Sequence, residues 1–271
     1  MQLIITEKGL VTKSDFWSGP TNTDQSVYEV IRVIGGVALF LEDHFDRLKQ
    51  SMEIQGISFG MEYTDFRQKI AEIITLNLKT EGNIKFSYLR IGNESEWFFT
   101  FIPHSYPNPE DYLNGVPTDL LFAERENPNA KVVQNAVREL ANQNLTTEKI
   151  YEVLLVDRNG LITEGSRSNV FFVKDNVFYT APASQVLVGV TRQKVIECLN
   201  ELSFQFVETD IHADEISRYD AAFLTGTSPK VLPIRSIGDQ MFRTGHAAVK
   251  QLMKCYNDLI DRYIQSHGDQ S

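Results

Sequence analysis

The most informative segment of this chain is Ile162-Thr163-Glu164-Gly165-Ser166-Arg167-Ser168-Asn169-Val170-Phe171. Its turn holds one glycine and two serines, and apolar residues that are typical of strands lie before and after the turn. Glycine lets backbone N–H groups approach a ligand closely, and serine adds hydroxyl donors. The turn is therefore a candidate anion-binding site, although a plain surface turn explains it better when it is taken alone.

Two further turns of the same kind lie downstream. Gly189-Val190-Thr191 opens a helical pattern, with Thr191 as the expected N-cap, and Thr225-Gly226-Thr227-Ser228-Pro229 follows a buried strand. A helix N-terminus offers unpaired N–H groups and a favourable dipole to an anion. The three turns together support a phosphate site and ordinary turns about equally.

Hydrophobic periodicity predicts strands and helices along the whole chain. In the first part we expect a hairpin turn at Gly35-Gly36, a helix capped by Asp43, a helix from about residue 64, and strands at 26–33, 37–41, 84–91 and 97–102. In the second part we expect helices at 133–144, after Thr191 and around 249–263, and strands at 119–122, 151–156, 160–163, 169–173, 177–179 and 221–224.

The segment from Pro103 to Pro109 contains three prolines in seven residues, which stop both helix and strand. We place a domain boundary near residues 104–116. This gives an N-terminal domain of residues 1–110 and a C-terminal domain of residues 111–271. A surface loop within one domain fits the composition about as well.

The composition excludes several classes of function. With 42% hydrophobic and 23% charged residues, the 271-residue chain is an ordinary globular protein, and its two cysteines argue against a disulfide framework and a cysteine-rich zinc site. A net charge of −10 argues against nucleic acid as a partner. We find no apolar run long enough for a bilayer and no targeting segment at the start, so we expect no membrane partner and a cytoplasmic location.

Common catalytic motifs are missing from the sequence. It contains no P-loop, no dinucleotide-binding G-x-G-x-x-G after a strand, no H-E-x-x-H and no G-x-S-x-G. The five histidines do not have metal-ligand spacing, so we expect no metal site.

Five blocks, taken in order, resemble the class IV (fold type IV) pyridoxal-phosphate aminotransferases, which include branched-chain and D-amino-acid aminotransferases and aminodeoxychorismate lyase. The blocks are Tyr28-Glu29-Val30-Ile31-Arg32-Val33 with the hairpin glycines, Glu42-Asp43-His44-Phe45-Asp46-Arg47-Leu48, the stretch from Ile162 to Phe171, Leu187-Val188-Gly189-Val190-Thr191-Arg192, and Thr225 to Pro233. The resemblance implies a mixed α+β and α/β fold of the D-amino-acid-aminotransferase type. A small N-terminal α/β domain would precede a larger, β-barrel-like C-terminal domain with helices.

The resemblance also implies roles for single residues. Lys131, 33 residues before Glu164, would form the imine with pyridoxal 5'-phosphate. Its nearest rival, Lys149, has the setting of a solvated loop. Glu164 would face the pyridine nitrogen and keep it protonated, and Leu187 would pack against the ring. The implied phosphate ligands are Arg47, Ser168, Val190, Thr191, Gly226 and Thr227.

Three residues are implied in substrate binding. Tyr28 would line the substrate site, and Arg32 and Arg90 would bind the substrate carboxylate, although both arginines could instead be strand-edge charges. The resemblance further implies an active site between the domains and a homodimer. Trp17 and Tyr28 flank the loop that would reach the neighbour.

The implied activity is transfer of an amino group between an amino acid, branched-chain-like or otherwise small, and a 2-keto acid. An aminodeoxychorismate lyase that forms 4-aminobenzoate and pyruvate is the main alternative, and a non-catalytic cofactor-binding protein is a remote one. Three departures from the family pattern leave substrate and stereochemistry open. Asn22-Thr23-Asp24-Gln25-Ser26 replaces a Gly-Asp-Gly in the entrance loop 14–26, Ala136 replaces a tyrosine, and Lys230 replaces a glutamate.

Overall fold

The structure is a computed structural model that describes residues 2–16, 25–125, 128–132, 135–147 and 149–268. Trp17 and most of the entrance loop lie outside the described residues, as does the expected start of a helix at Val133. The chain forms two compact units. The smaller unit comprises Met1–Ser105, Ala130–Val133 and Ile260–Ser271, and the larger comprises Tyr106–Asn129 and Gln134–Leu259. The division into functional domains at residue 110 stays a prediction.

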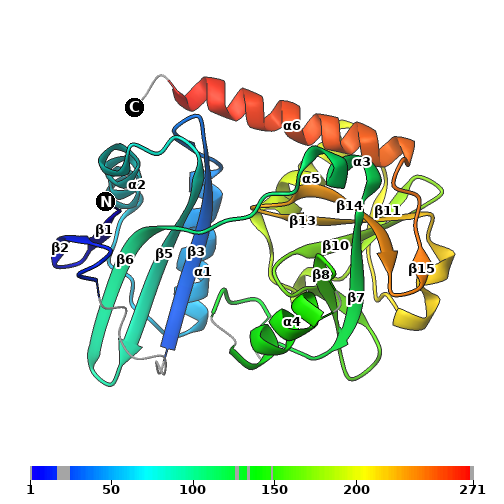
Figure 1. Cartoon of the computed structure of the whole chain (residues 1–271), viewed down its shortest axis with the longest axis horizontal. Helices are drawn as coiled ribbons and strands as arrows, with labels where there is room; N and C mark the ends of the chain where they lie inside the picture. Colours follow the sequence, from blue (N-terminus) through cyan, green and yellow to red (C-terminus); the bar gives the residue numbers. More distant parts are fainter. Residues whose placement is uncertain (1, 17–24, 126–127, 133–134, 148, 269–271) are drawn as a thin grey trace. The chain divides into compact units, whose positions relative to one another are not determined.

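The smaller unit is built on a six-stranded sheet with the order β2-β1-β6-β5-β3-β4 (Figure 1). The predicted hairpin between β3 and β4 is confirmed, because Val33 pairs with Ala38 and Ile34 with Val37. Both turn residues between them, Gly35 and Gly36, have positive φ, which suits glycine. The strands are β1 (Leu3–Thr6), β2 (Gly9–Thr12), β3 (Gln25–Ile34), β4 (Val37–Ala38), β5 (Gly82–Ile91) and β6 (Glu94–Ile102).

The two faces of this sheet differ. Along β3 the odd-numbered residues Val27, Ile31 and Val33 are buried in an apolar core with residues of α1 (Leu41–Ile54) and α2 (Tyr63–Asn77). Because side chains alternate along a strand, Tyr28, Val30 and Arg32 lie on the opposite face. We call this second face the Tyr28 face.

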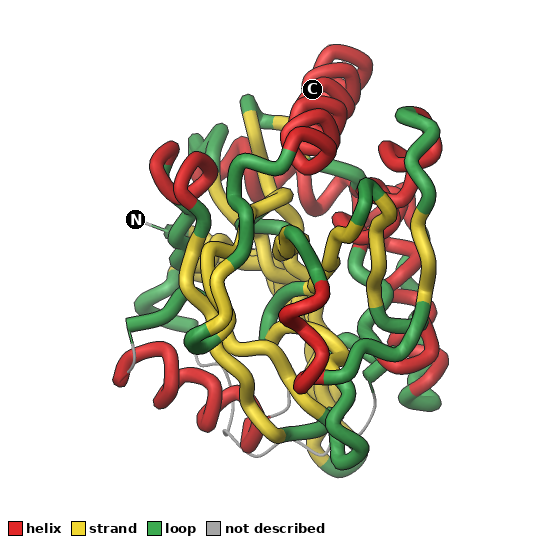
Figure 2. The backbone as a smooth tube through the Cα atoms, turned by 90° about the vertical axis from the view of Figure 1, so that its right-hand side faces the viewer, coloured by secondary structure: helices red, strands yellow, loops and turns green. Residues whose placement is uncertain are grey.

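The larger unit contains a nine-stranded sheet in which β12-β11-β10-β13-β14-β7-β8-β9 are consecutive neighbours and β15 pairs with β14. The strands of both sheets are yellow in Figure 2. The signature stretch forms β9, the following turn and β10. Glu164 and Gly165 belong to β9, whereas the sequence suggested that they begin the turn. The strands are β7 (Val116–Phe122), β8 (Glu152–Val156), β9 (Ile162–Gly165), β10 (Asn169–Lys174), β11 (Val177–Thr180), β12 (Phe206–Glu208), β13 (Ala221–Gly226), β14 (Lys230–Ile237) and β15 (Gln240–Met241).

Two expected helix caps are wrong. The first helix begins at Leu41 after Phe40, so Asp43 lies within its first turn. Helix α5 begins at Val190 with Gly189 as N-cap and ends at Glu201, so Thr191 is its second residue. The other helices are α3 (Pro109–Asn114), α4 (Asn135–Thr147) and α6 (Ala247–His267), with short 3₁₀ turns at Ala183–Gln185 and Ala213–Arg218. None of the helices in the described ranges combines the length and apolarity that a bilayer requires.

Candidate active site

The main chain of Lys131 forms hydrogen bonds that hold this residue in the smaller unit. Its N–H donates to Oγ of Ser51 on α1, and its carbonyl accepts from the N–H of Tyr28 on β3. Val132 pairs with Val27 in an antiparallel bridge, so the segment lies along the edge of β3. The Nζ atom of Lys131 lies 5.0 Å from the centroid of the Tyr28 ring. This lysine is therefore fixed at a defined position, whereas Lys149 is exposed in a loop.

Three titratable side chains, Glu29, His44 and Arg47, are buried beside this lysine, where helix α1 packs on β3. Arg47 donates from one guanidinium nitrogen to both oxygens of Glu29, at 2.7 and 2.9 Å, and His44 Nδ1 lies 2.7 Å from Glu29 Oε2. Burial alone would raise the pKa of Glu29, but the charges of Arg47, His44 and Lys131 outweigh it and lower that pKa to about 2. Burial lowers the pKa of His44 despite the nearby carboxylate. Glu29 is therefore an ionised acceptor to which His44 Nδ1–H donates.

Arg47, the predicted phosphate ligand, thus keeps one side of its guanidinium on Glu29. Its Nε atom is buried and has no hydrogen-bond partner among the described residues. A buried N–H without a partner is costly unless a ligand satisfies it. An anion such as a phosphate group fits this donor.

The three predicted substrate-binding residues do not share one face. Tyr28 and Arg32 lie on the Tyr28 face, whereas Arg90 pairs in register with Gln25 and therefore projects to the helix-covered face. Arg90 is exposed and donates to Gln25 Oε1 and to the carbonyl of Gly92. On the Tyr28 face a different cation approaches the ring. Nζ of Lys85 on β5 lies 5.0 Å from the Tyr28 centroid.

In the larger unit, the signature turn is built around a second buried carboxylate, Glu152 on β8. Its oxygens accept hydrogen bonds from the hydroxyls of Ser166 and Ser168, at 2.6 and 3.0 Å. They also accept from the backbone N–H groups of Val153 and Arg167. The hydroxyl proton of Ser168, a predicted phosphate ligand, is thus directed at Glu152. Burial raises the pKa of Glu152, although these four hydrogen bonds oppose the rise.

Glu164 is buried and held from three sides. Its Oε1 accepts from Arg125 at 2.9 Å, and its Oε2 accepts from Nδ2 of Asn169 at 3.3 Å and from the N–H of Leu187 at 3.2 Å. Leu187 was expected beside the cofactor ring, and its main chain contacts the carboxylate that was expected beside the ring nitrogen. Arg125 was not predicted, because it lies 39 residues from Glu164 and outside every recognised block.

The start of α5 and the end of β13 offer donors for an anion. Gly189 has no side chain to cap the helix, so the first N–H groups of α5, at Val190 and Thr191, have no side-chain acceptor from the N-cap. A Cβ at Gly189 would lie 2.3 Å from Oδ1 of Asn169, so this approach requires glycine. Thr225 pairs with Asn169 across the strands, and its buried hydroxyl has no partner within the described part of the chain. These donors suit the phosphate of a cofactor. Gly226 ends β13, and Thr227 follows in the turn.

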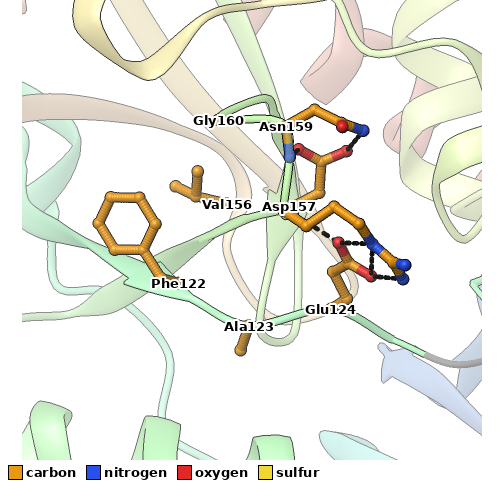
Figure 3. A pocket seen from close by; sticks show the side chains of 8 residues that line it. Phe122, Ala123, Glu124, Val156, Asp157, Asn159 and Gly160 are labelled. Atoms are coloured by element: carbon orange, nitrogen blue, oxygen red, sulfur yellow. Dashed lines mark hydrogen bonds and ion pairs between the residues drawn. The ribbon is translucent and has the colours of Figure 1, made fainter.

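An open pocket on the larger unit is separate from the predicted residues. It measures 650 Å³ and lies where β7 ends against the turn between β8 and β9 (Figure 3). Its polar wall is the ion pair of Arg158 with Glu124, and Asp157 accepts from Asn159 beside it. None of the predicted cofactor or substrate residues lines it. In addition, the described residues contain no group of three histidine, cysteine or acidic side chains that could hold a metal.

The comparison with protein families assigns the chain. The model for "Amino-transferase class IV" matches residues 26–237. The chain belongs to the class IV aminotransferases. The expected family and the fold type IV architecture are thereby confirmed, and the protein is an enzyme of a pyridoxal-phosphate-dependent family.

Relatives come from more than one branch of this family. The D-alanine aminotransferase of Bacillus licheniformis is 28% identical over 233 residues, and the match covers 81% of each chain. A probable branched-chain-amino-acid aminotransferase of Rickettsia typhi is 30% identical over 250 residues, 84% of each chain. The crystal structure of the Escherichia coli branched-chain amino acid aminotransferase is 21% identical. The structural likeness covers 96% of this chain and 94% of that one, with a TM-score of 0.86. It shows that the two chains share a fold.

Proposed function

We propose that this aminotransferase binds pyridoxal 5'-phosphate covalently at Lys131 and acts on a small amino acid, branched-chain or similar, and a 2-keto acid. The observation that carries the proposal is the fixed main chain of Lys131, bonded to Ser51 and Tyr28, beside the buried Arg47. When bound, the cofactor accepts the electrons of the bond that breaks at the substrate α-carbon. Nζ of Lys131 would act as the base that moves the α-proton.

The remaining residues would bind and orient the cofactor. Arg47 through Nε, the first N–H groups of α5 at Val190 and Thr191, and the turn at Gly226 and Thr227 would hold the phosphate. Glu164, fixed by Arg125 and Asn169, would keep the ring nitrogen protonated. Leu187 would cover one ring face, and Ser168 would stabilise the signature turn through Glu152.

We further propose a homodimer in the cytoplasm with small-molecule substrates. The dimer follows from the family resemblance. Size-exclusion chromatography with light scattering tests it, and a monomer at working concentration contradicts it.

The visible spectrum of the cofactor-loaded enzyme tests the function. Addition of an amino acid should remove the absorption of the covalently attached cofactor and release a 2-keto acid, and separate L- and D-amino acids identify the preferred stereochemistry. The Lys131→Ala variant should lack the band, while Lys149→Ala retains it. A band that ignores every amino acid, together with pyruvate release from aminodeoxychorismate, would instead establish the lyase. A band without either reaction would leave a non-catalytic binding protein.

A further inference from the structure

We infer that Tyr263, in the last helix α6, is a positioning residue for the cofactor site: its hydroxyl caps helix α1 and thereby holds Arg47 in place for a phosphate group. The inference rests on the proposed function, because it takes Arg47 as a phosphate ligand. Tyr263 lies in the part of α6 that belongs to the smaller unit, as do α1 and Arg47. The contacts that carry the inference are therefore all within that unit.

Helix α1 begins without a side-chain cap of its own. The residue before it, Phe40, has φ 51° and ψ 44°, a left-handed conformation that is unfavourable for a bulky side chain, and this side chain makes no capping hydrogen bond. The N–H groups of a first helical turn have no partners within the helix, and helix ends fray. The start of α1 therefore has to be stabilised by another part of the chain.

The hydroxyl of Tyr263 supplies this partner. It accepts from the N–H of Leu41, the first residue of α1, at 3.1 Å and donates to Oε2 of Glu42 at 2.7 Å. Neighbouring rings hold Tyr263, because its centroid lies 4.9 Å from that of Phe40 and 4.0 Å from that of His267, which stacks on it. Burial and the hydrogen bond to Glu42 raise the pKa of Tyr263, so the hydroxyl keeps its proton at neutral pH. The last helix thus provides the N-cap that α1 lacks.

The capped turn leads directly to the predicted phosphate ligand. Arg47 lies within two helical turns of Leu41. The N–H of His44 donates to the carbonyl of Phe40, the residue on whose ring Tyr263 packs. Loss of the cap therefore loosens the turns from which His44 and Arg47 reach the site. An apparent affinity falls with the fraction of molecules in the binding-competent form, so a frayed start of α1 should weaken phosphate binding.

Tyr63 offers a matched control, because its hydroxyl bonds to the same carboxylate but does not cap the helix. It donates to Oε1 of Glu42 at 2.8 Å. Tyr63→Phe and Tyr263→Phe each remove one hydroxyl from Glu42, but only Tyr263→Phe removes the acceptor of the Leu41 N–H, and it keeps the ring. If the two hydroxyls only stabilise the carboxylate, both variants should behave alike, whereas the cap predicts a difference.

Hydrogen exchange in the cofactor-free protein tests the cap without any ligand. Amide exchange of the segment 41–48 is followed by mass spectrometry in the wild type and in both variants. We expect exchange to become about 2- to 30-fold faster in Tyr263→Phe, the range that corresponds to the loss of a helix cap, and to change less than twofold in Tyr63→Phe. Equal rates in Tyr263→Phe and the wild type would overturn the inference.

A binding measurement connects the cap to the cofactor site. Pyridoxine 5'-phosphate has the ring and the phosphate but no aldehyde, so its binding, measured by calorimetry, does not depend on a covalent bond to Lys131. We expect its Kd to rise about 3- to 10-fold in Tyr263→Phe and less than twofold in Tyr63→Phe. Equal changes in the two variants, or no change in Tyr263→Phe, would overturn the inference. If the wild type binds this compound but forms no visible band with pyridoxal 5'-phosphate, the proposed function fails and the comparison of the variants still decides the inference.

Discussion

Two buried carboxylates, Glu29 in the smaller unit and Glu152 in the larger, have opposite kinds of hydrogen-bond partner. Both side chains are removed from water. Glu29 is bonded to the guanidinium of Arg47, and its pKa falls to about 2. Glu152 is surrounded by two hydroxyls and two backbone N–H groups without a cation among these partners, and its pKa rises.

The difference shows what each carboxylate can do. A carboxylate balanced by a cation holds that cation in place, so Glu29 fixes Arg47 near Lys131. A carboxylate that binds only neutral donors arranges the backbone, so Glu152 holds the turn that follows Glu164. Removal of one partner from the pair of Glu29 with Arg47 should therefore lower the free energy of unfolding strongly. Removal of one donor from Glu152 should lower it less, because each neutral hydrogen bond contributes little.

The largest expected effect is that of Arg47→Met. Removal of the guanidinium leaves Glu29 as an uncompensated buried charge, which should cost about 3–5 kcal/mol of unfolding free energy at pH 7. Urea unfolding of the cofactor-free protein measures it. Arg90→Met, which removes an exposed arginine, is the control and should cost less than about 0.5 kcal/mol. If Glu29→Gln/Arg47→Met is no more stable than Arg47→Met alone, the two residues do not act as a pair.

The pH dependence of stability should have opposite signs at the two sites. The pKa of Glu29 is lowered on folding from 4.5 to about 2, so its contribution of about 3 kcal/mol is present above pH 4.5 and disappears as the pH falls toward 2. The pKa of Glu152 is raised, so its carboxyl favours folding at low pH and opposes it as the pH rises above 4.5. The free energy of unfolding is measured from pH 2 to pH 7 for the wild type and for Glu29→Gln/Arg47→Met. The value for the wild type minus that for the variant should increase with pH. A difference that does not change with pH would show that the pairing of Glu29 with Arg47 does not stabilise the fold.

Glu152→Gln is the corresponding change at the second carboxylate. The serine hydroxyls can turn to accept from the new amide, but the N–H groups of Val153 and Arg167 face different oxygens, so one of them loses its acceptor. The cost should be about 1–3 kcal/mol. It should shrink as the pH rises, because the charge in the wild type is itself unfavourable. A cost that grows with pH would show that Glu152 behaves like Glu29.

The smallest expected effect is that of Ser166→Ala. It removes one of four donors to Glu152 and should cost about 0.5–1.5 kcal/mol in thermal or urea unfolding. Thr146→Ala, which removes an exposed hydroxyl bonded to a helix carbonyl, is the matched control and should cost less. Equal costs would mean that the buried carboxylate adds nothing to an ordinary hydroxyl hydrogen bond.

Local patterns predicted much of the fold. The alternation at 26–33 and the two glycines after it predicted β3 and its hairpin, because residues close in sequence determine both. β14 was not predicted, although it pairs with β13, and neither was the parallel pairing of β7 with β8. Such pairings depend on partners far away in the sequence, which periodicity does not contain.

The site was predicted as separate residues, and their roles stay predictions. The blocks led to Lys131, Arg47 and Glu164, but they did not show that Glu29 and Arg125 are the partners of these residues. Glu29 was even part of a recognised block, and its pairing with Arg47 follows only from the packing of α1 on β3. Strand register likewise separated Arg90 from Tyr28, which a one-dimensional motif cannot show.

Borohydride reduction would identify the lysine that carries the cofactor. The pyridoxal-phosphate-loaded protein is reduced, digested and analysed by mass spectrometry. We predict one phosphopyridoxyl group, on the peptide that contains Lys131. The same group on Lys149 or Lys85, or on no lysine, would show that Lys131 does not carry the cofactor.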